Sequence, residues 1–473
     1  MKKVLRAYKK TVSIVNETAI WMYENLGSDR VGFLMESNEK ESGKYTFMGV
    51  DPQALVQSQK DGLVITENNG NVTKLKGNPL VLLKEYFSSF EVHSDETQDE
   101  FNGGLVGSLG YDFIRYTENL PDDNEDEIGI ETIQLMLALK FIAIDHMAET
   151  VTAVVLDEDN EKGKKRALAE AEKLIDEART PGNENKKSCE IKNHHDGVII
   201  KKSDTLEQYS EKVNKIKEYI KEGHIFQTVL SQRWTIQTKQ TGFDLYKQLR
   251  VLNPSPYLYY YNFGKFEIIG SSPEMIVKQT GNNVYTCPIA GTRKRGKTKE
   301  EDEALERELL SDEKEKAEHV MLVDLARNDC GRVSQIGSVK VTEFMRVQRY
   351  SHVMHIVSLV EGKKHGSCHP LDMVSSFLPA GTLSGAPKIR AMEIIDELET
   401  VRRGLYGGAK GNLAFEGNMN FCITIRTMIK KGDKVYLQAG AGIVADSVPE
   451  NEYQECCNKV MALAKTLVEE ENL

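Results

Sequence analysis

Apolar and polar positions divide the chain into a strand-rich first part and a second part in which strands and helices alternate. In the first part, short alternating runs at residues 45–50 and 62–66 are bounded by turn residues, which predicts an antiparallel β-rich region. The glycine-rich run at 103–112 lacks the flanking pattern of a dinucleotide-binding fingerprint. It therefore predicts a strand and a tight turn packed closely against their neighbours.

A boundary between two regions is predicted near residue 200. Residues 161–179 form a charged, amphipathic helical pattern, and residues 180–188 have the proline, glycine and polar side chains of a linker. The sequence thus predicts an α+β fold with a β-rich N-terminal region over residues 1–200 and a second domain over residues 201–473.

The second region reads as helices and strands in alternation. Residues 203–207 carry a helix-capping pattern, and the helix that follows is predicted to end near residue 222. Residues 224–236 alternate as a half-buried strand does. A glycine-rich turn is predicted to lead into a helix over 388–398, and Gly440-Ala-Gly442 is predicted to follow a strand over 434–438.

Composition and charge are those of a soluble enzyme. The chain has 473 residues, of which 28% are charged, and its net charge of −11 disfavours binding to nucleic acid or to an anionic membrane. No apolar run approaches the roughly 20 residues that span a bilayer, and the N-terminus lacks a signal core, so a cytoplasmic location is expected. The seven cysteines form no C-x-x-C pair, so neither a zinc site nor a disulfide framework is indicated.

Two predicted helices carry glutamate pairs that suggest a metal site. Glu315 and Glu318, like Glu452 and Glu455, are three residues apart, which places both carboxylates of each pair on one helix face. Mg²⁺ is usually held by one or two protein carboxylates together with waters and oxygens of the substrate. The alternative is that both faces are simply solvated.

Five sequence motifs lie in the second region, and two further motifs lie upstream of these five in the chain. They lie at residues 288–295, 319–329, 349–357, 380–390 and 438–444, and the preceding motifs lie at 32–37 and 253–258. Together they resemble the chorismate-utilising enzymes, and within that family the component I chains of anthranilate synthases. The resemblance implies a large α/β/β/α sandwich of antiparallel sheets flanked by helices. It also makes residues 201–473 the chorismate-binding catalytic domain and places an effector site in the region 1–200.

The resemblance assigns roles that the residues alone would not. A lone histidine among apolar neighbours, as at position 355, is more often a packed core residue, and Arg426 would be a surface charge. By resemblance, His355 and Thr382 are catalytic residues, and Glu318 and Glu455 bind Mg²⁺ directly. Glu315 and Glu452 would support these ligands without touching the metal or would reach it through water. The residues that the resemblance implies for binding chorismate are Gly291, Thr292, Tyr406, Arg426, Gly440, Ala441, Gly442 and Lys459.

Two positions bear on the nucleophile. Relatives that add water to chorismate carry a lysine base where this chain has Gln227, and a glutamine cannot take a proton from water. Aminodeoxychorismate synthases, which are the alternative within the family, typically carry a lysine where this chain has Ala290. Both residues favour direct attack by ammonia, followed by loss of pyruvate to give anthranilate. A remote alternative is a chorismate-binding regulator without catalysis.

The resemblance also implies a partner and an effector. A glutaminase needs a nucleophilic cysteine in a Gly-x-Cys-x-Gly elbow, and none of the cysteines has that context, so glutamine hydrolysis is expected on a separate glutamine amidotransferase subunit. Feedback inhibition by L-tryptophan is expected from a separate site. The residues expected to bind tryptophan are Ser37, Pro256, Tyr257 and Leu258.

Overall fold

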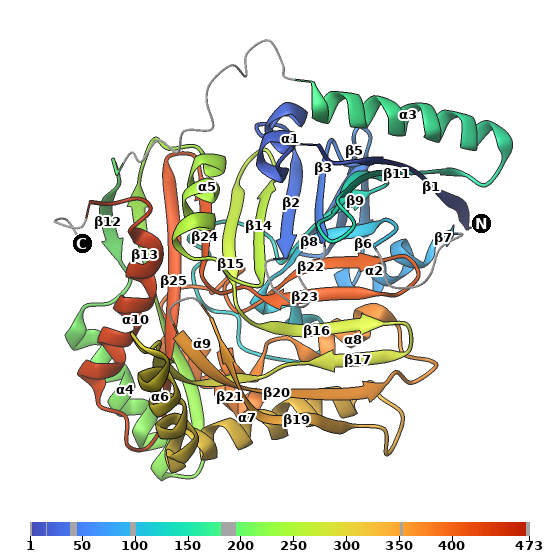
Figure 1. Ribbon diagram of the computed structural model, residues 1–473. Helices are drawn as coiled ribbons and strands as arrows, with labels where there is room; N and C mark the ends of the chain where they lie inside the picture. The colour runs from blue at the N-terminus through green and yellow to red at the C-terminus, as the bar shows by residue number, and fades with distance from the viewer. Residues whose placement is uncertain are drawn as a thin grey trace.

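Two large sheets packed face to face form the centre of the molecule, with helices on their outer sides (Figure 1). The computed structural model describes residues 2–15, 17–37, 45–94, 101–180, 195–350 and 353–469. Neighbouring strands are antiparallel throughout both sheets except for β1 and β7, which pair in parallel. The predicted α+β fold with an α/β/β/α layering is therefore confirmed.

The first sheet combines strands from both parts of the chain. In spatial order it contains β12 (Val198–Lys202), β13 (Gln227–Gln237), β25 (Lys434–Ile443), β24 (Thr427–Lys431), β15 (Glu267–Ser272), β14 (Tyr257–Asn262), β2 (Gly32–Ser37), β3 (Tyr45–Val50), β10 (Lys140–Asp145), β11 (Thr150–Glu158), β1 (Lys3–Ser13) and β7 (Phe90–His93). The short strand β21 (Gly385–Ala386) pairs with β13.

The second sheet is mixed in the same way. Its order is β18 (Ile289–Lys294), β20 (Val353–Lys363), β17 (Asn283–Thr286), β16 (Met275–Thr280), β23 (Met419–Ile423), β22 (Ala409–Ala414), β8 (Gly104–Leu109), β9 (Ile133–Ala138), β4 (Ala54–Gln59), β5 (Gly62–Glu67) and β6 (Val72–Lys76). Strand β19 (Lys340–Arg349) pairs with β20.

Helices cover the outer sides of both sheets. The first sheet is contacted by α1 (Ala19–Leu26), α3 (Glu161–Arg179), α4 (Leu206–Lys221), α5 (Gly242–Leu252), α9 (Lys388–Leu398) and α10 (Pro449–Ala464). The second sheet is contacted by α2 (Pro79–Ser88), α6 (Lys299–Ser311), α7 (Glu313–Gly331) and α8 (Pro370–Phe377). The short 3₁₀ helices η1 (Tyr111–Tyr116) and η2 (Gly381–Leu383) lie in connections.

The two regions predicted from the sequence share both sheets. Strand β14 pairs with β2, with Tyr257 opposite Ser37, and β22 pairs with β8, with Gly411 opposite Gly107. In Figure 1 the blue strand β2 accordingly lies beside the yellow-green strand β14. Most of the predicted linker, residues 181–188, lies outside the described residues, so the boundary near residue 200 stays a prediction about the sequence.

Most elements expected from the sequence are present. Helix α3 spans Glu161–Arg179, and α4 begins at Thr205, whose side chain accepts a hydrogen bond from the Gln208 amide in a capping box. The glutamate pairs lie on α7 and α10 as predicted. Within the described residues the cysteines are free thiols, and no helix there is long and apolar enough to cross a membrane.

Two local predictions were wrong. Strand β13 is buried along both faces up to its last residue, because helices α4 and α9 cover the face that the sequence pattern left to solvent. Gly440, Ala441 and Gly442 belong to β25 and do not form a turn after it. The hydrogen-bonded ladder between β25 and β13 continues through them as far as Ile443.

Candidate active site

A cavity of about 250 Å³ lies where β13 and β25 of the first sheet face α7, α10 and the start of β18. Most residues predicted to bind substrate or metal line it, although they come from distant parts of the chain. These lining residues are Glu318, Thr382, Tyr406, Arg426, Gly440, Gly442, Glu455 and Lys459. Gln227 and Ala290, the two positions that bear on the nucleophile, line the same cavity. We call it the catalytic cavity.

The glycines of β25 make room for neighbouring side chains. A Cβ atom on Gly440 would lie 3.0 Å from the Tyr406 hydroxyl, and one on Gly442 would lie 2.5 Å from Nε2 of Gln227. Ala441 points the other way, into a small apolar cluster with Leu230. The two glycines therefore bring the strand backbone, Tyr406 and Gln227 together at the cavity wall, whereas Ala441 does not line it.

Arg426 is a partly buried cation at the wall of the catalytic cavity. Its backbone lies in the left-handed region with φ of 48°, between β23 and β24, and its carbonyl accepts a hydrogen bond from the Ser271 amide. Within the part of the chain that the structure describes, its guanidinium has no hydrogen bond or ion pair, and burial lowers the pKa of Arg426. A planar guanidinium left unpaired at a cavity wall suits a ligand carboxylate.

Glu274 is a cavity residue that sequence analysis missed. Its side chain accepts a hydrogen bond from the Thr382 hydroxyl at 3.2 Å, and burial raises the pKa of this carboxyl to about 8. The group is therefore protonated at neutral pH and able to donate a proton. Glu274 follows Pro273 in the two-residue connection between β15 and β16, and a charged residue between two strand patterns was the signal that could have revealed it.

His355 lies next to the catalytic cavity rather than in its wall. Its Nδ1 is 3.0 Å from the Gly291 carbonyl oxygen and 3.0 Å from the Thr292 hydroxyl, which places all three of these predicted residues in one group. Burial, helped by the positive charge of Arg426, lowers the pKa of His355. With Nδ1–H donated to the carbonyl, a neutral imidazole keeps its Nε2 lone pair as a proton acceptor.

Helices α7 and α10 bring Glu318 and Glu455 to the wall of the catalytic cavity, whereas Glu315 is held by an arginine. Burial raises the pKa of Glu318, and the charges of Glu315 and Glu455 raise it further. The Glu455 carboxylate accepts a hydrogen bond from Lys459 at 2.7 Å, and Lys459 also donates to the Gly440 carbonyl at 2.9 Å. Glu315 instead accepts a hydrogen bond from the Arg293 guanidinium at 3.1 Å.

This pair of carboxylates fits a hard divalent cation. Within the described residues, no group of three or more histidine, cysteine, aspartate or glutamate side chains is arranged to hold a metal ion. Mg²⁺ does not require such a group, because it takes most of its oxygen ligands from water and from an anionic ligand. Burial is the main cause of the raised pKa of Glu318, and the smaller contributions of Glu315 and Glu455 are a repulsion that a bound cation would relieve.

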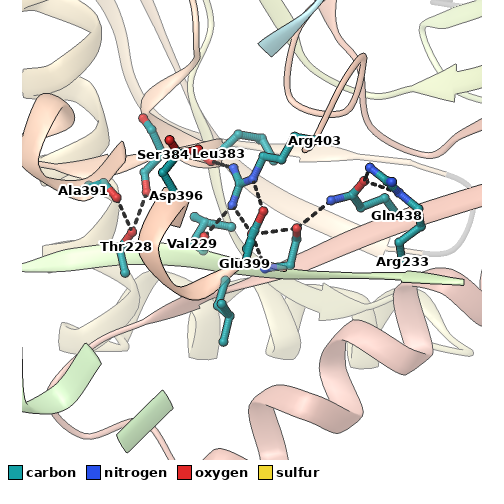
Figure 2. A network of polar contacts seen from close by, with 12 residues as sticks. Thr228, Val229, Arg233, Leu383, Ser384, Ala391, Asp396, Glu399, Arg403 and Gln438 are labelled. Atoms are coloured by element: carbon teal, nitrogen blue, oxygen red, sulfur yellow. Dashed lines mark hydrogen bonds and ion pairs between the residues drawn. The ribbon is translucent and has the colours of Figure 1, made fainter. Parts of the chain in front are cut away.

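A buried polar network holds the catalytic turn η2 against β13 (Figure 2). The Arg403 guanidinium donates to the carbonyl oxygens of Leu383 and Val229, and it pairs with Glu399 at 2.7 Å. Glu399 in turn accepts hydrogen bonds from the Ser231 amide and hydroxyl. Since Leu383 directly follows Thr382, this ion pair fixes the position of the Thr382 hydroxyl relative to β13.

The same network continues along the sheet. Gln438 donates to the Ser231 hydroxyl at 2.8 Å and accepts from Arg233, so it joins β25 to β13 behind the cavity. Sequence analysis assigned no role to Glu399, Arg403 or Gln438. The spacing of four residues between Glu399 and Arg403 is compatible with an ion pair and was the available signal.

A second, larger cavity of about 370 Å³ lies between the two sheets. Three of the four residues predicted to bind an effector line it, namely Ser37, Tyr257 and Leu258, whereas Pro256 does not. Glu36 also lines this cavity, and its carboxylate is held by Arg250 at 2.8 Å and by the Tyr246 hydroxyl. We call it the interior cavity.

Known proteins resemble this chain over nearly its whole length. The family model described as chorismate binding enzyme matches residues 32–465. Anthranilate synthase component 1 of Acetivibrio thermocellus is 48% identical, with 96% of this chain and 93% of that protein covered, and the Aquifex aeolicus protein of the same name is 44% identical, with 92% and 88% covered.

Solved structures agree with the fold. The crystal structure of anthranilate synthase component I from Streptococcus pneumoniae has a TM-score of 0.80 and 36% identity, covering 96% of this chain and 99% of that one. The menaquinone-specific isochorismate synthase from Escherichia coli has a TM-score of 0.73 at 18% identity, covering 98% and 95%. At that identity, the second likeness concerns the fold alone.

Proposed function

The chain belongs to the chorismate-binding enzymes and, within them, to the anthranilate synthase component 1 family, and we propose that it converts chorismate and ammonia into anthranilate, pyruvate and water. The observation that carries this proposal is the composition of the catalytic cavity. It combines an unpaired arginine, a pair of carboxylates on facing helices and a protonated glutamic acid in one space.

Chorismate has two carboxylates, and the cavity offers two places for them. Arg426 provides a bidentate donor for the enolpyruvyl carboxylate, with the Tyr406 hydroxyl and the backbone at Gly440 and Gly442 beside it. Glu318 and Glu455 would hold Mg²⁺ against the ring carboxylate. When bound, the cation draws electron density into that carboxylate and neutralises the charge around it.

The proton transfers are assigned to two groups of different character. Glu274 is protonated at neutral pH and accepts a hydrogen bond from Thr382, so it is the donor to the departing ring hydroxyl, which leaves as water. His355 is neutral and retains a free Nε2 lone pair, so it is the acceptor for a proton released as the ring becomes aromatic. Thr382 orients the Glu274 carboxyl.

Two wall residues support ammonia as the nucleophile. Gln227 and Ala290 both line the cavity, and neither can deprotonate water or form a covalent bond to the ring. Ammonia carries its own lone pair and needs no such base. Addition of ammonia with loss of the ring hydroxyl, followed by loss of pyruvate and a ring proton, balances the overall conversion.

The ammonia is proposed to come from glutamine on a partner glutamine amidotransferase subunit. None of the seven cysteines lies in a Gly-x-Cys-x-Gly elbow, so this chain has no such nucleophile of its own. Free ammonia would serve as a slower substitute. We place this assembly in the cytoplasm.

The interior cavity is the proposed site for L-tryptophan as a feedback inhibitor. It is lined by Ser37, Tyr257 and Leu258, and aromatic side chains such as Phe47 and Phe101 suit an indole ring. Inhibition requires tryptophan to bind the low-activity state more tightly than the active state.

Product analysis tests the proposed activity. Purified chain is incubated with chorismate, Mg²⁺ and ammonium salt at alkaline pH, and products are separated by chromatography with fluorescence detection of anthranilate. Anthranilate and pyruvate in equal amounts are expected, and glutamine should replace ammonium only when an amidotransferase subunit is added. Accumulation of 4-amino-4-deoxychorismate would assign the chain to the alternative synthase, and salicylate or isochorismate would overturn the assignment of ammonia as the nucleophile. Absence of any product would favour the non-catalytic regulator.

A further inference from the structure

The interior cavity has a buried lysine that none of the roles above explains. Lys410 lies on β22 and lines the cavity, and its side chain is 0% exposed. Its Nζ has no hydrogen-bond partner among the described residues. Nζ lies 5.2 Å from the ring centre of Tyr259 and 5.8 Å from that of Tyr261. The two ring faces stabilise a cation there only in part, because they accept no hydrogen bond comparable to that of a carboxylate.

Among the described residues, the strands packed around Lys410 supply no counter-charge. Opposite it on the neighbouring strands are Ser108 of β8 and Cys422 of β23, and across the sandwich are the tyrosines of β14. Burial raises the pKa of Cys422 to about 12 and those of Tyr259 and Tyr261 well above their ordinary value, so all three are neutral. Burial lowers the pKa of the Lys410 amine to about 7.

Two other charged residues among those described at this cavity, Glu36 and Lys278, have different surroundings. The carboxylate of Glu36 is already paired with Arg250 and receives the Tyr246 hydroxyl, so it does not compensate Lys410. Lys278 lies on β16 and is partly exposed to solvent. Among the described residues at the cavity wall, Lys410 is therefore the fully buried amine, and aromatic rings surround it.

We propose that Lys410 is the carboxylate-binding group of the interior cavity and that it takes up a proton when an aromatic amino acid binds there. The inference rests on the proposed effector role of this cavity and adds the side chain that recognises the acid group of the ligand. A carboxylate would supply the missing hydrogen-bond partner and favour the charged amine, while the surrounding rings pack on the aromatic part. The four rotatable bonds of lysine allow Nζ to turn from the tyrosine rings toward the ligand.

Calorimetric titration tests the proton uptake directly. The full chain is titrated with L-tryptophan at pH 7.5 in phosphate and in Tris, whose ionisation enthalpies differ, so the dependence of the binding enthalpy on the buffer counts the protons taken up. Uptake of a fraction of a proton is expected for the wild type and none for Lys410→Met, which has a side chain of similar length without the amine. Lys410→Met should also bind tryptophan roughly tenfold or more weakly, since a charge-assisted hydrogen bond is lost. Lys278→Met is the matched control and should keep both the uptake and the affinity.

Two further ligands separate this inference from the proposed effector role. Tryptamine lacks the carboxylate and should bind without proton uptake, which provides a test in the wild-type chain even if Lys410→Met does not fold. Indole-3-propionate keeps the carboxylate and should show uptake even if tryptophan itself does not bind. Equal proton uptake in the wild type and in Lys410→Met, uptake with tryptamine, or loss of uptake in Lys278→Met instead would overturn the role of Lys410 while leaving tryptophan as the effector. Failure of all three ligands to bind would overturn both.

Discussion

The catalytic cavity and the interior cavity are built from the same two sheets but differ in the charged side chains that line them. Among the described residues, the catalytic cavity gathers the protonated carboxyl group of Glu274 and the carboxylates of Glu318 and Glu455 around an unpaired arginine, Arg426. The interior cavity holds an unpaired lysine among aromatic rings. Arg426 and Lys410 both lack a hydrogen-bond partner among the described residues, so in each cavity a ligand carboxylate would complete an interaction that folding leaves open.

The largest effect is expected where the catalytic cavity depends on a cation. Glu318→Gln should lower the rate of anthranilate formation at least roughly a hundredfold, because a neutral amide no longer provides the charge that holds Mg²⁺. The same is expected of Glu455→Gln. The measurement is the initial rate over a titration of Mg²⁺, with circular dichroism to confirm folding.

Glu313→Gln is the matched control, since Glu313 lies on the same helix but pairs with Lys316 at the surface. It should leave the rate unchanged. Near-normal turnover of Glu318→Gln at ordinary Mg²⁺ concentration would mean that the metal ligands have been assigned to the wrong residues.

Substitution of Arg426 should have the next largest effect on activity. Arg426→Lys keeps a positive charge but loses the planar fork, so kcat/KM for chorismate should fall by about tenfold to a hundredfold. Arg426→Gln should fall further because the buried carboxylate of the substrate is then unpaired. Steady-state kinetics over a chorismate titration give the comparison, and equal kcat/KM for Arg426→Lys and the wild type would rule out a bidentate contact.

Glu274 should give the catalytic cavity a characteristic pH dependence. Its pKa is raised to about 8, so the proton that it donates is present below that pH and lost above it. At a constant concentration of free ammonia, the rate of the wild type should therefore decline as pH rises through 8, and Glu274→Gln, which is slower throughout, should lack this decline. A pH profile of kcat/KM measures both, and an unchanged alkaline limb in the variant would assign the proton to another group.

The pH dependence of the free energy of unfolding tests the raised pKa of Glu274 independently of activity. The ordinary pKa of a glutamate is 4.5, so between pH 4.5 and 8 the folded chain holds a proton that the unfolded chain has released. The free energy of unfolding of the wild type should thus fall with rising pH in this window relative to Glu274→Gln. Urea unfolding at pH 5 and pH 8 measures the difference.

Loss of the buried amine should also change the stability of the chain when the interior cavity holds no ligand. The ordinary pKa of a lysine is 10.5, and burial lowers that of Lys410 to about 7, so between these values the unfolded chain binds the extra proton. Lys410→Met should be more stable than the wild type at pH 7, by about 1.4 kcal/mol for each unit of that lowering. The advantage should shrink as pH rises toward 10, since wild-type stability increases in this window. A constant difference between the two proteins would indicate a normal lysine.

Much of this arrangement is visible in the sequence because it depends on spacing. The helical glutamate pairs, the capping of α4 and the length of α3 all follow from local periodicity and were predicted at nearly their observed positions. The strand character of Gly440–Gly442 could not be predicted in this way, because it is imposed by pairing with β13, about 200 residues away in the chain.

Single buried residues were harder to predict for the same reason. Glu274 and Lys410 have no spacing pattern of their own, and their importance arises only when Thr382 is placed beside one and two tyrosine rings beside the other. Conversely, Pro256 was predicted to line the effector site with Tyr257 and Leu258, but it precedes β14 and lies outside the cavity wall.

If the interior cavity controls the catalytic cavity as proposed, their ligands must be thermodynamically linked. The dissociation constant of L-tryptophan is measured by calorimetry with and without saturating chorismate, in the presence of Mg²⁺ and the absence of ammonium. Chorismate should weaken tryptophan binding roughly fivefold or more, and tryptophan should weaken chorismate binding by the same factor. Ser37→Phe should abolish the heat of tryptophan binding. Tryptophan binding that is unaffected by chorismate and by Ser37→Phe, or no binding up to millimolar concentration, would contradict it.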